Sequence, residues 1–230
     1  MSVEDSMVIL ATDTSGRNGS LALAHVATGR SEIEVLEVVL LAGGTFSAQL
    51  VPQITVLLKT HGFRKSDLAG FAVASGPGSF TGLRVGLAAI KALAEVLGKP
   101  IAAVSRLEAV ARSGGVHDRV MAVLDAGRGE VYAGDYVLKP EVRMSSERLL
   151  SKEEFLVAAK GSVVVTPEAS WAEAARAAGL LVEQVDYPRS DVIARLGWER
   201  IQCGQTVRPD QLEANYIRRS DAEIFSKPKA

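Results

Sequence analysis

The chain has 230 residues, a length that can bury a hydrophobic core without the help of disulfides or metal ions. Its 26 lysines and arginines nearly balance 27 aspartates and glutamates, and the formal net charge of −1 argues against a protein that binds nucleic acid through a largely basic face. The single cysteine, Cys203, excludes an internal disulfide and a cysteine-based zinc site.

The first part of the chain is predicted to form three strands and a helix. Apolar runs at 7–12 and 20–26 flank a turn rich in glycine and asparagine, which is typical of an antiparallel hairpin. A third apolar run follows at 33–41. Leucine, valine and isoleucine then recur at the spacing of one helical face, which predicts a helix over 47–60.

A strand–helix–strand unit follows, with strands at 70–75 and 101–105 around a long helix at 83–97. This order predicts a parallel crossover connection and therefore an α/β fold. The second half is predicted to contain strands at 120–125, 130–138, 163–166 and 180–185, helices at 106–112, 151–159, 169–178 and 190–203, and a polar surface tail from 208.

Two aspartates occupy the same position in two similar hairpins. Asp13 ends the first strand of the chain and Asp125 ends the first strand of the second half, and each precedes a turn with glycine and arginine and then another strand. This repetition is typical of a two-lobed actin-like fold. Aspartate also ends strands and starts turns in unrelated proteins, so the repetition alone leaves both interpretations open.

The usual sequence signatures of catalysis are absent. His25, His61 and His117 form no helical metal-binding pair, and there is no Gly-x-Ser-x-Gly nucleophile elbow. We therefore expect no catalytic residue, no bound metal and no cofactor, and we expect each histidine to be a surface or structural residue. Cys203 lies late in a predicted helix, where we expect a buried, unreactive thiol.

The segment 75–84 reads Ser-Gly-Pro-Gly-Ser-Phe-Thr-Gly-Leu-Arg and joins a strand to a helix. Free backbone N–H groups and the helix dipole make such a junction a natural anion site, and Ser79 or Thr81 can cap the helix. The glycine spacing matches neither a Walker A motif nor a dinucleotide-binding fingerprint. The glycines alone favour a tight structural turn.

This segment occurs together with Ile-Leu-Ala-Thr-Asp-Thr-Ser at 9–15, Asp-Ala-Gly-Arg-Gly-Glu-Val-Tyr at 125–132 and Tyr-Ile-Arg at 216–218. In residues, spacing and order, the set resembles the bacterial TsaB family, also called YeaZ. The resemblance covers nearly the whole chain and is strongest over 7–138. Its signature residues are Gly76, Pro77, Gly78, Ser79, Phe80, Thr81, Gly82, Arg84 and Asp125.

The resemblance implies a reduced actin-like, Hsp70-like ATPase fold of the ribonuclease H-like class, with two lobes. We expect the lobes at 1–104 and 105–230, with the helix at 190–203 a candidate to pack back on the first. It further implies a non-catalytic partner subunit in the formation of threonylcarbamoyladenosine in tRNA. The implied partners are the catalytic paralogue TsaD and the small ATPase TsaE, with tRNA contacted through the complex. The family's older glycoprotease-like label does not fit the absent nucleophile.

Two positions depart from the family pattern. Phe46 stands where members often carry a histidine, which removes a polar side chain there, and Gly127 stands where arginine is usual. The alternative function is a nucleotide-binding actin-like ATPase or transferase. In that case Asp13 would hold a hydrated Mg²⁺, and Thr14 and Ser15 would approach phosphate.

The resemblance places the partner surface on the helices at 47–60 and 83–97 of the first lobe. Gly82 and Gly86 are small enough to let another helix approach closely. The candidate interface residues are Leu50, Ile54, Leu57, Gly82, Gly86 and Ile90. When the partner is absent, we expect a homodimer through the same face. The competing interpretation is that both apolar stripes belong to the core.

The N-terminus lacks the basic region of a signal peptide, and no apolar run approaches the roughly 20 residues needed to span a bilayer. We therefore expect a cytoplasmic protein that does not enter a membrane.

Overall fold

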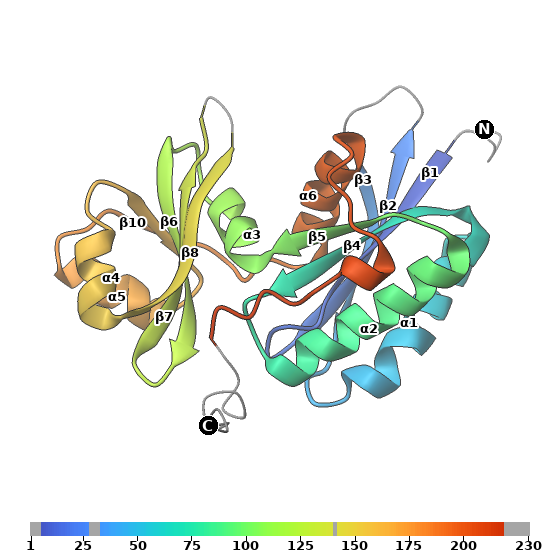
Figure 1. Cartoon of the computed structure of the whole chain (residues 1–230), viewed down its shortest axis with the longest axis horizontal. Coiled ribbons are helices and arrows are strands. Elements are labelled where there is room, and N and C mark those ends of the chain that lie inside the picture. Colours follow the sequence, from blue (N-terminus) through green and yellow to red (C-terminus); the bar gives the residue numbers. More distant parts are fainter. Residues whose placement is uncertain (1–5, 28–32, 140–141, 219–230) are drawn as a thin grey trace, which may run out of the picture. The chain divides into compact units, whose positions relative to one another are not determined.

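The structure, a computed structural model, describes residues 6–27, 33–139 and 142–218 (Figure 1). The chain divides into two compact units. Unit 1 is built from Met1–Ser105 and Pro188–Ala214, and unit 2 from Arg106–Tyr187 and Asn215–Ala230. The chain therefore passes between the units three times, after β5, before α6 and within the C-terminal segment.

Unit 1 contains a five-stranded sheet in the order β3-β2-β1-β4-β5. β1 pairs with β2 and β2 with β3 in antiparallel fashion, whereas β4 runs parallel to both β1 and β5. Helices α1 and α2 cover one face of this sheet and α6 covers the other (Figure 1). The elements of unit 1 are β1 (Ser6–Asp13), β2 (Gly19–Ala27), β3 (Glu34–Leu41), α1 (Phe46–Thr60), the 3₁₀ helix η2 (Lys65–Asp67), β4 (Leu68–Gly76), α2 (Phe80–Leu97), β5 (Ile101–Ser105), α6 (Ser190–Gln202) and the 3₁₀ helix η3 (Pro209–Gln211).

The face of the first sheet under α6 is made of very small side chains. Ala22, Ala11, Ala72 and Ala102 lie directly opposite one another on four adjacent strands and are all buried. A Cβ atom at Gly197 of α6 would lie only 2.2 Å from the Cβ of Ala72. The alanines and the glycine therefore allow α6 to approach the sheet closely.

Two serines, Ser190 and Ser20, link the start of α6 to the start of β2 by hydrogen bonds. The N–H of Ser190 donates to Oγ of Ser20 at 2.9 Å, and the Ser190 hydroxyl donates to the Ser20 carbonyl at 2.7 Å. Both residues are buried. These bonds satisfy polar groups at a helix start, where the backbone N–H groups have no partner within the helix.

Unit 2 repeats the strand order of unit 1. Its sheet reads β10-β9-β6-β7-β8, with antiparallel pairs β6–β7 and β7–β8 and parallel pairs β6–β9 and β9–β10. Its elements are α3 (Arg106–Ser113), β6 (Arg119–Gly127), β7 (Glu130–Val137), β8 (Arg143–Ser151), α4 (Lys152–Ala158), β9 (Val163–Thr166), α5 (Ala169–Ala177) and β10 (Val182–Gln184).

The repeated order decides between the two interpretations of the aspartates. Asp13 ends β1 and Asp125 lies near the end of β6, which are corresponding strands of two sheets with the same topology. The predicted α/β, two-lobed ribonuclease H-like fold is therefore confirmed, and the aspartates mark a structural duplication.

Three details differ from the sequence predictions. β8 was not predicted, because as an edge strand it carries mostly polar, exposed residues and lacks an apolar run. The tail from 208 is not confined to the surface, because Leu212 is buried in the core of unit 1, shortly after Val207 pairs with Ile101. Cys203 is exposed rather than buried, because α6 ends at Gln202 and the thiol lies just beyond the packed helix.

Among the described residues, no helix has the length and apolar character needed to cross a membrane.

Candidate functional site

The three predicted nucleotide-site residues form a buried turn after β1. The exposed fractions of Asp13, Thr14 and Ser15 are 5%, 3% and 1%. Oδ1 of Asp13 accepts a hydrogen bond from the backbone N–H of Ser15 at 2.8 Å and another from the Ser15 hydroxyl. The turn thus uses the Asp13 carboxylate to satisfy its own donors.

The same turn holds the first part of α2. Oγ1 of Thr14 donates to the carbonyl oxygen of Gly82 at 2.7 Å, and the carbonyl of Ser15 accepts the N–H of Ser79 at 2.7 Å. The Ser79 hydroxyl accepts the N–H of Gly82 at 3.3 Å, which confirms Ser79 as the cap of α2. These bonds therefore hold the start of α2, and the signature loop that leads into it from β4, against the turn after β1.

Gly82 and Gly86 are required by this turn. A Cβ at Gly82 would lie 2.0 Å from the carbonyl oxygen of Thr14, and a Cβ at Gly86 would lie 2.4 Å from Oγ1 of Thr14. Both distances are far below any van der Waals contact. The two glycines therefore face Thr14 of the same chain, and their small size does not need a partner helix to explain it.

The other predicted interface residues also lie inside unit 1. Leu50, Ile54 and Leu57 of α1 and Ile90 of α2 are buried in its hydrophobic core. This is the outcome that the competing interpretation expected, in which both apolar stripes belong to the core. Other residues form the outward surface of the two helices, with Val51, Thr55 and Val56 on α1 and Ala88 and Ala92 on α2 exposed. Sequence periodicity marked the buried stripe because that stripe carries the larger apolar residues.

In unit 2, Asp125 belongs to a polar cluster that sequence reasoning found only in part. Oδ1 of Asp125 accepts the indole N–H of Trp171 at 2.9 Å, and Oε1 of Glu168 accepts the backbone N–H of Asp125 at 3.3 Å. Oε2 of Glu168 accepts the Tyr187 hydroxyl at 2.6 Å. Glu168 and Tyr187 follow β9 and β10, so the carboxyl ends of neighbouring parallel strands bring them together.

Tyr187 keeps its proton in this cluster. Burial, and then the hydrogen bond to the Glu168 carboxylate and its negative charge, raise the pKa of Tyr187 to about 12. Tyr187 therefore remains a neutral donor, and Glu168 and Asp125 remain acceptors of hydrogen bonds within the unit.

The two departures from the family pattern have local structural reasons. Phe46 is buried, and a Cβ at Gly19 would lie 2.8 Å from its ring, so the position fills an apolar part of unit 1. Gly127 has a φ of +71° in the β6–β7 turn, a conformation that strains an arginine. A polar role at position 46 and an arginine at position 127 are therefore both absent from this chain.

No group of three or more potential metal-binding side chains occurs within residues 6–27, 33–139 and 142–218. Two of the histidines pair with carboxylates instead: Nε2 of His61 lies 2.8 Å from Oε2 of Glu37, and Nε2 of His117 lies 2.6 Å from Oε2 of Glu183. These pairs account for both side chains structurally. Arg84 of the signature lies over the ring of Phe80, 4.8 Å from its centre.

Comparisons with known proteins agree with this description. Residues 40–187 match the family model described as "TsaD: tRNA N6-adenosine threonylcarbamoyltransferase". The Bacillus subtilis tRNA threonylcarbamoyladenosine biosynthesis protein TsaB is 37% identical over 58% of this chain and 56% of that protein. The Escherichia coli protein of the same name is 29% identical over 94% of this chain and 96% of that protein.

A solved structure has the same fold over nearly its full length. YeaZ from Pseudomonas aeruginosa superposes with a TM-score of 0.74 at 27% identity, covering 91% of this chain and 99% of that one. The family model, the near full-length relative and the shared fold lead to one conclusion: the chain belongs to the TsaB (YeaZ) family.

Proposed function

We propose that this chain is the non-catalytic partner subunit in the biosynthesis of threonylcarbamoyladenosine in tRNA. In this role it binds the catalytic paralogue TsaD and activates it, TsaE joins the pair, and the complex works in the cytoplasm, where its tRNA is. The observation that carries the proposal is family membership, since relatives along most of the chain are named for this biosynthesis.

The strand ends in both units support a role without catalysis. In unit 1 the polar groups of Asp13, Thr14 and Ser15 bond to one another and to α2, and all three residues are buried. In unit 2 the carboxylates of Asp125 and Glu168 occupy the corresponding end of the sheet. Because the polar side chains at these strand ends already bond within their own units, both arrangements disfavour the alternative of a nucleotide-binding ATPase.

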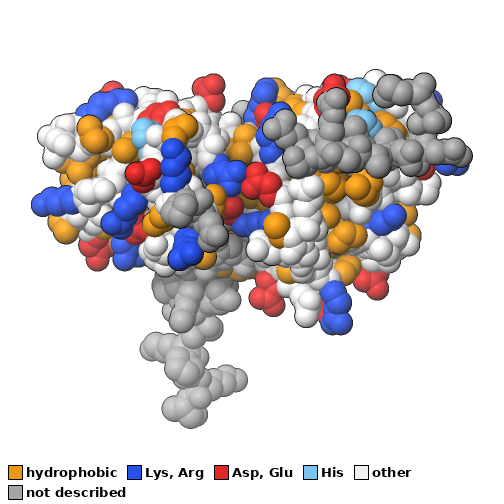
Figure 2. All heavy atoms as spheres, turned by 90° about the horizontal axis from the view of Figure 1, so that it is seen from above, with side chains coloured by type: hydrophobic (Ala, Val, Ile, Leu, Met, Phe, Trp, Pro, Cys, Tyr) orange, Lys and Arg blue, Asp and Glu red, His pale blue; other side chains and the backbone are white. Residues whose placement is uncertain are grey.

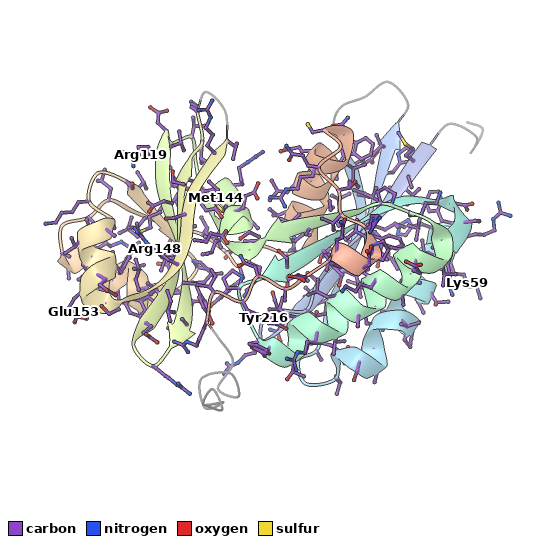
Figure 3. All side chains as sticks on the ribbon, viewed as in Figure 1. Lys59, Arg119, Met144, Arg148, Glu153 and Tyr216 are labelled. Carbon is purple, nitrogen blue, oxygen red and sulfur yellow. The ribbon has the colours of Figure 1, made fainter. Side chains whose placement is uncertain are left out.

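The outward face of α1 and α2 is the surface we propose for TsaD. The exposed fractions of Val51 and Val56 are 49% and 56%, and exposed Ala88 and Ala92 continue the apolar character on α2. Lys59 lies at the far end of α1 (Figure 3). A face with small apolar residues and few charges is typical of the centre of a protein interface. When TsaD is absent, a second copy of the chain would cover the same face.

The surface charge supports contact with tRNA through the complex. Basic and acidic side chains are interspersed on the face of the molecule in Figure 2. Direct binding of tRNA by one subunit calls for a continuous basic surface. We therefore propose that TsaD supplies the principal tRNA contacts.

Reconstitution with purified proteins tests the function. Threonylcarbamoyladenosine in tRNA is measured by mass spectrometry of digested nucleosides after incubation with TsaD and TsaE, with or without this chain. Product should form only when this chain is present together with TsaD. Product from this chain alone would contradict the non-catalytic role, and full activity of TsaD and TsaE without it would contradict the activating role.

A matched pair of variants tests the surface. Val56→Glu places a charge on the outward face of α1, whereas Val157→Glu makes the same change on exposed α4 of unit 2. Because an unpaired charge is costly at an interface, we expect Val56→Glu to weaken binding to TsaD by about tenfold or more. Val157→Glu should bind normally, and both should fold, as judged by circular dichroism. Equal binding by the two variants would remove α1 from the proposed interface.

A further inference from the structure

The start of α2 is held against the β1 turn by contacts of two kinds. Hydrogen bonds from Thr14 to Gly82 and from Ser79 to Ser15, each 2.7 Å long, prevent α2 from moving away from the turn. The close approach of Gly82 and Gly86 to Thr14 prevents it from moving nearer. These contacts therefore restrict both the depth and the rotation of α2 at this end.

We propose that Thr14 is a positioning residue for partner binding, which acts through α2. The inference rests on the proposed function, because α2 supplies half of the surface proposed for TsaD. Thr14 itself is buried and does not touch that surface. Its hydroxyl fixes the inner side of α2 at Gly82 and Gly86, and exposed Ala88 and Ala92 lie further along the same helix.

The rigidity of α2 transmits a shift at its first turn, near Thr14, to the surface proposed for TsaD. α2 is one uninterrupted helix of 18 residues, so a shift of its first turn displaces Ala88 and Ala92 as well. Binding surfaces tolerate displacements of only about 0.5 Å before complementarity suffers. The turn that the sequence marked as a candidate nucleotide site thus has a mechanical role in this chain.

Thr12 provides a matched control on the same strand. Its hydroxyl is buried and has no hydrogen-bond partner among the described residues. Thr12→Val therefore removes a buried hydroxyl without breaking a bond, whereas Thr14→Val removes the hydroxyl that bonds to Gly82. The two variants make the same change of composition and shape, and of the two only Thr14→Val removes a hydrogen bond to α2.

The test measures the affinity of each variant for purified TsaD by isothermal titration calorimetry, at a temperature where circular dichroism shows the chain to be folded. We expect Thr14→Val to weaken binding by about tenfold. Thr14→Ser, which keeps the hydroxyl, should restore binding to within about threefold of the original chain, and Thr12→Val should leave it unchanged.

A second variant, on α2, disrupts the same hydrogen bond between Thr14 and Gly82. Gly86→Ala places a methyl group against Oγ1 of Thr14 and forces the hydroxyl to rotate away from Gly82. It should weaken binding as Thr14→Val does, and it keeps the test open if Thr14→Val fails to fold.

The outcomes separate this inference from the proposed function. If the original chain does not bind TsaD, the proposed function is wrong. If the original chain binds and folded Thr14→Val or Gly86→Ala binds equally well, the positioning role is wrong. Failure of Thr14→Ser to restore binding would also overturn it, because the hydroxyl would then not be the group responsible.

Discussion

Glu183 on β10 binds the loop that contains Gly115 and His117 and precedes β6. Its two carboxylate oxygens accept the N–H of Gly115 at 2.8 and 2.9 Å, and Oε2 lies 2.6 Å from Nε2 of His117. The hydrogen bond from Gly115, followed by the one with His117, holds the pKa of Glu183 below its ordinary value of 4.5. The carboxylate form of this one residue therefore favours the folded loop.

This contact predicts a dependence of stability on pH. Because the pKa is lower in the folded chain than in the unfolded chain, the contribution of Glu183 is fully present above the unfolded pKa and is lost as the pH falls through the folded value. We expect Glu183→Gln to lower the free energy of unfolding near about pH 7, and its difference from the original chain to shrink toward about pH 3.5. Urea titrations at both pH values measure this.

Glu173, an exposed residue of α5, provides the control for that measurement. Glu173→Gln should change the free energy of unfolding little at either pH. A Glu183→Gln effect that stays constant between the two pH values would show that the ionised carboxylate is not the group responsible.

At the scale of elements, α6 depends on the small residues beneath it. It follows unit 2 in the sequence, yet it packs on the sheet of unit 1 through Gly197 and the row of alanines that includes Ala72. A larger residue at the contact has no space to enter, since the Cβ–Cβ distance would be 2.2 Å.

Gly197→Ala should therefore destabilise unit 1, although alanine has the higher helix propensity. Overpacking of this kind costs about 1–3 kcal/mol, which urea denaturation would show as a lower midpoint. Adding Ala72→Gly should recover part of the loss, because it removes the opposing methyl group. If the single variant is as stable as the original chain, α6 does not lie as close to the sheet as described.

At the scale of the whole molecule, each unit has its own core, and the C-terminal segment contributes to both. Leu212 is buried in unit 1, whereas Ile217 packs in unit 2. There Arg218 donates to the carbonyl of Ala126 at 2.8 Å and forms an ion pair with Glu130. Arg218, at the end of the described chain, thus contacts residues on both sides of the β6–β7 turn of unit 2.

This anchor predicts an effect confined to one unit. Each unit contains one tryptophan, Trp198 in unit 1 and Trp171 in unit 2. Arg218→Ala should lower the stability reported by Trp171 in a Trp198→Phe chain by about 1–2 kcal/mol, and it should leave the transition reported by Trp198 in a Trp171→Phe chain unchanged.

Arg176→Ala, at an exposed position of α5, is the matched control for the loss of an arginine in unit 2. It should move neither fluorescence transition. Equal shifts of both transitions by Arg218→Ala would instead mean that the two units unfold together.

The sequence by itself determined most of the secondary structure and the family. Local apolar patterns predicted the strand at 101–105 without error and the helix at 47–60 to within one residue. The signature motif identified the family, whereas the paired aspartates left the duplicated fold as one of two interpretations until the strand orders were known. These features depend on residues close together in the chain, where periodicity, turns and caps act directly.

Only the tertiary structure decided what the functional candidates touch. Thr14 and Gly82 are 68 positions apart, and Ser20 and Ser190 are 170 apart. The small size of Gly82 and Gly86 was visible in the sequence, but it was equally compatible with a partner helix and with a turn of the same chain. The tertiary structure shows that the two glycines face the turn, because the parallel order of β1 and β4 brings the end of β1 against the start of α2.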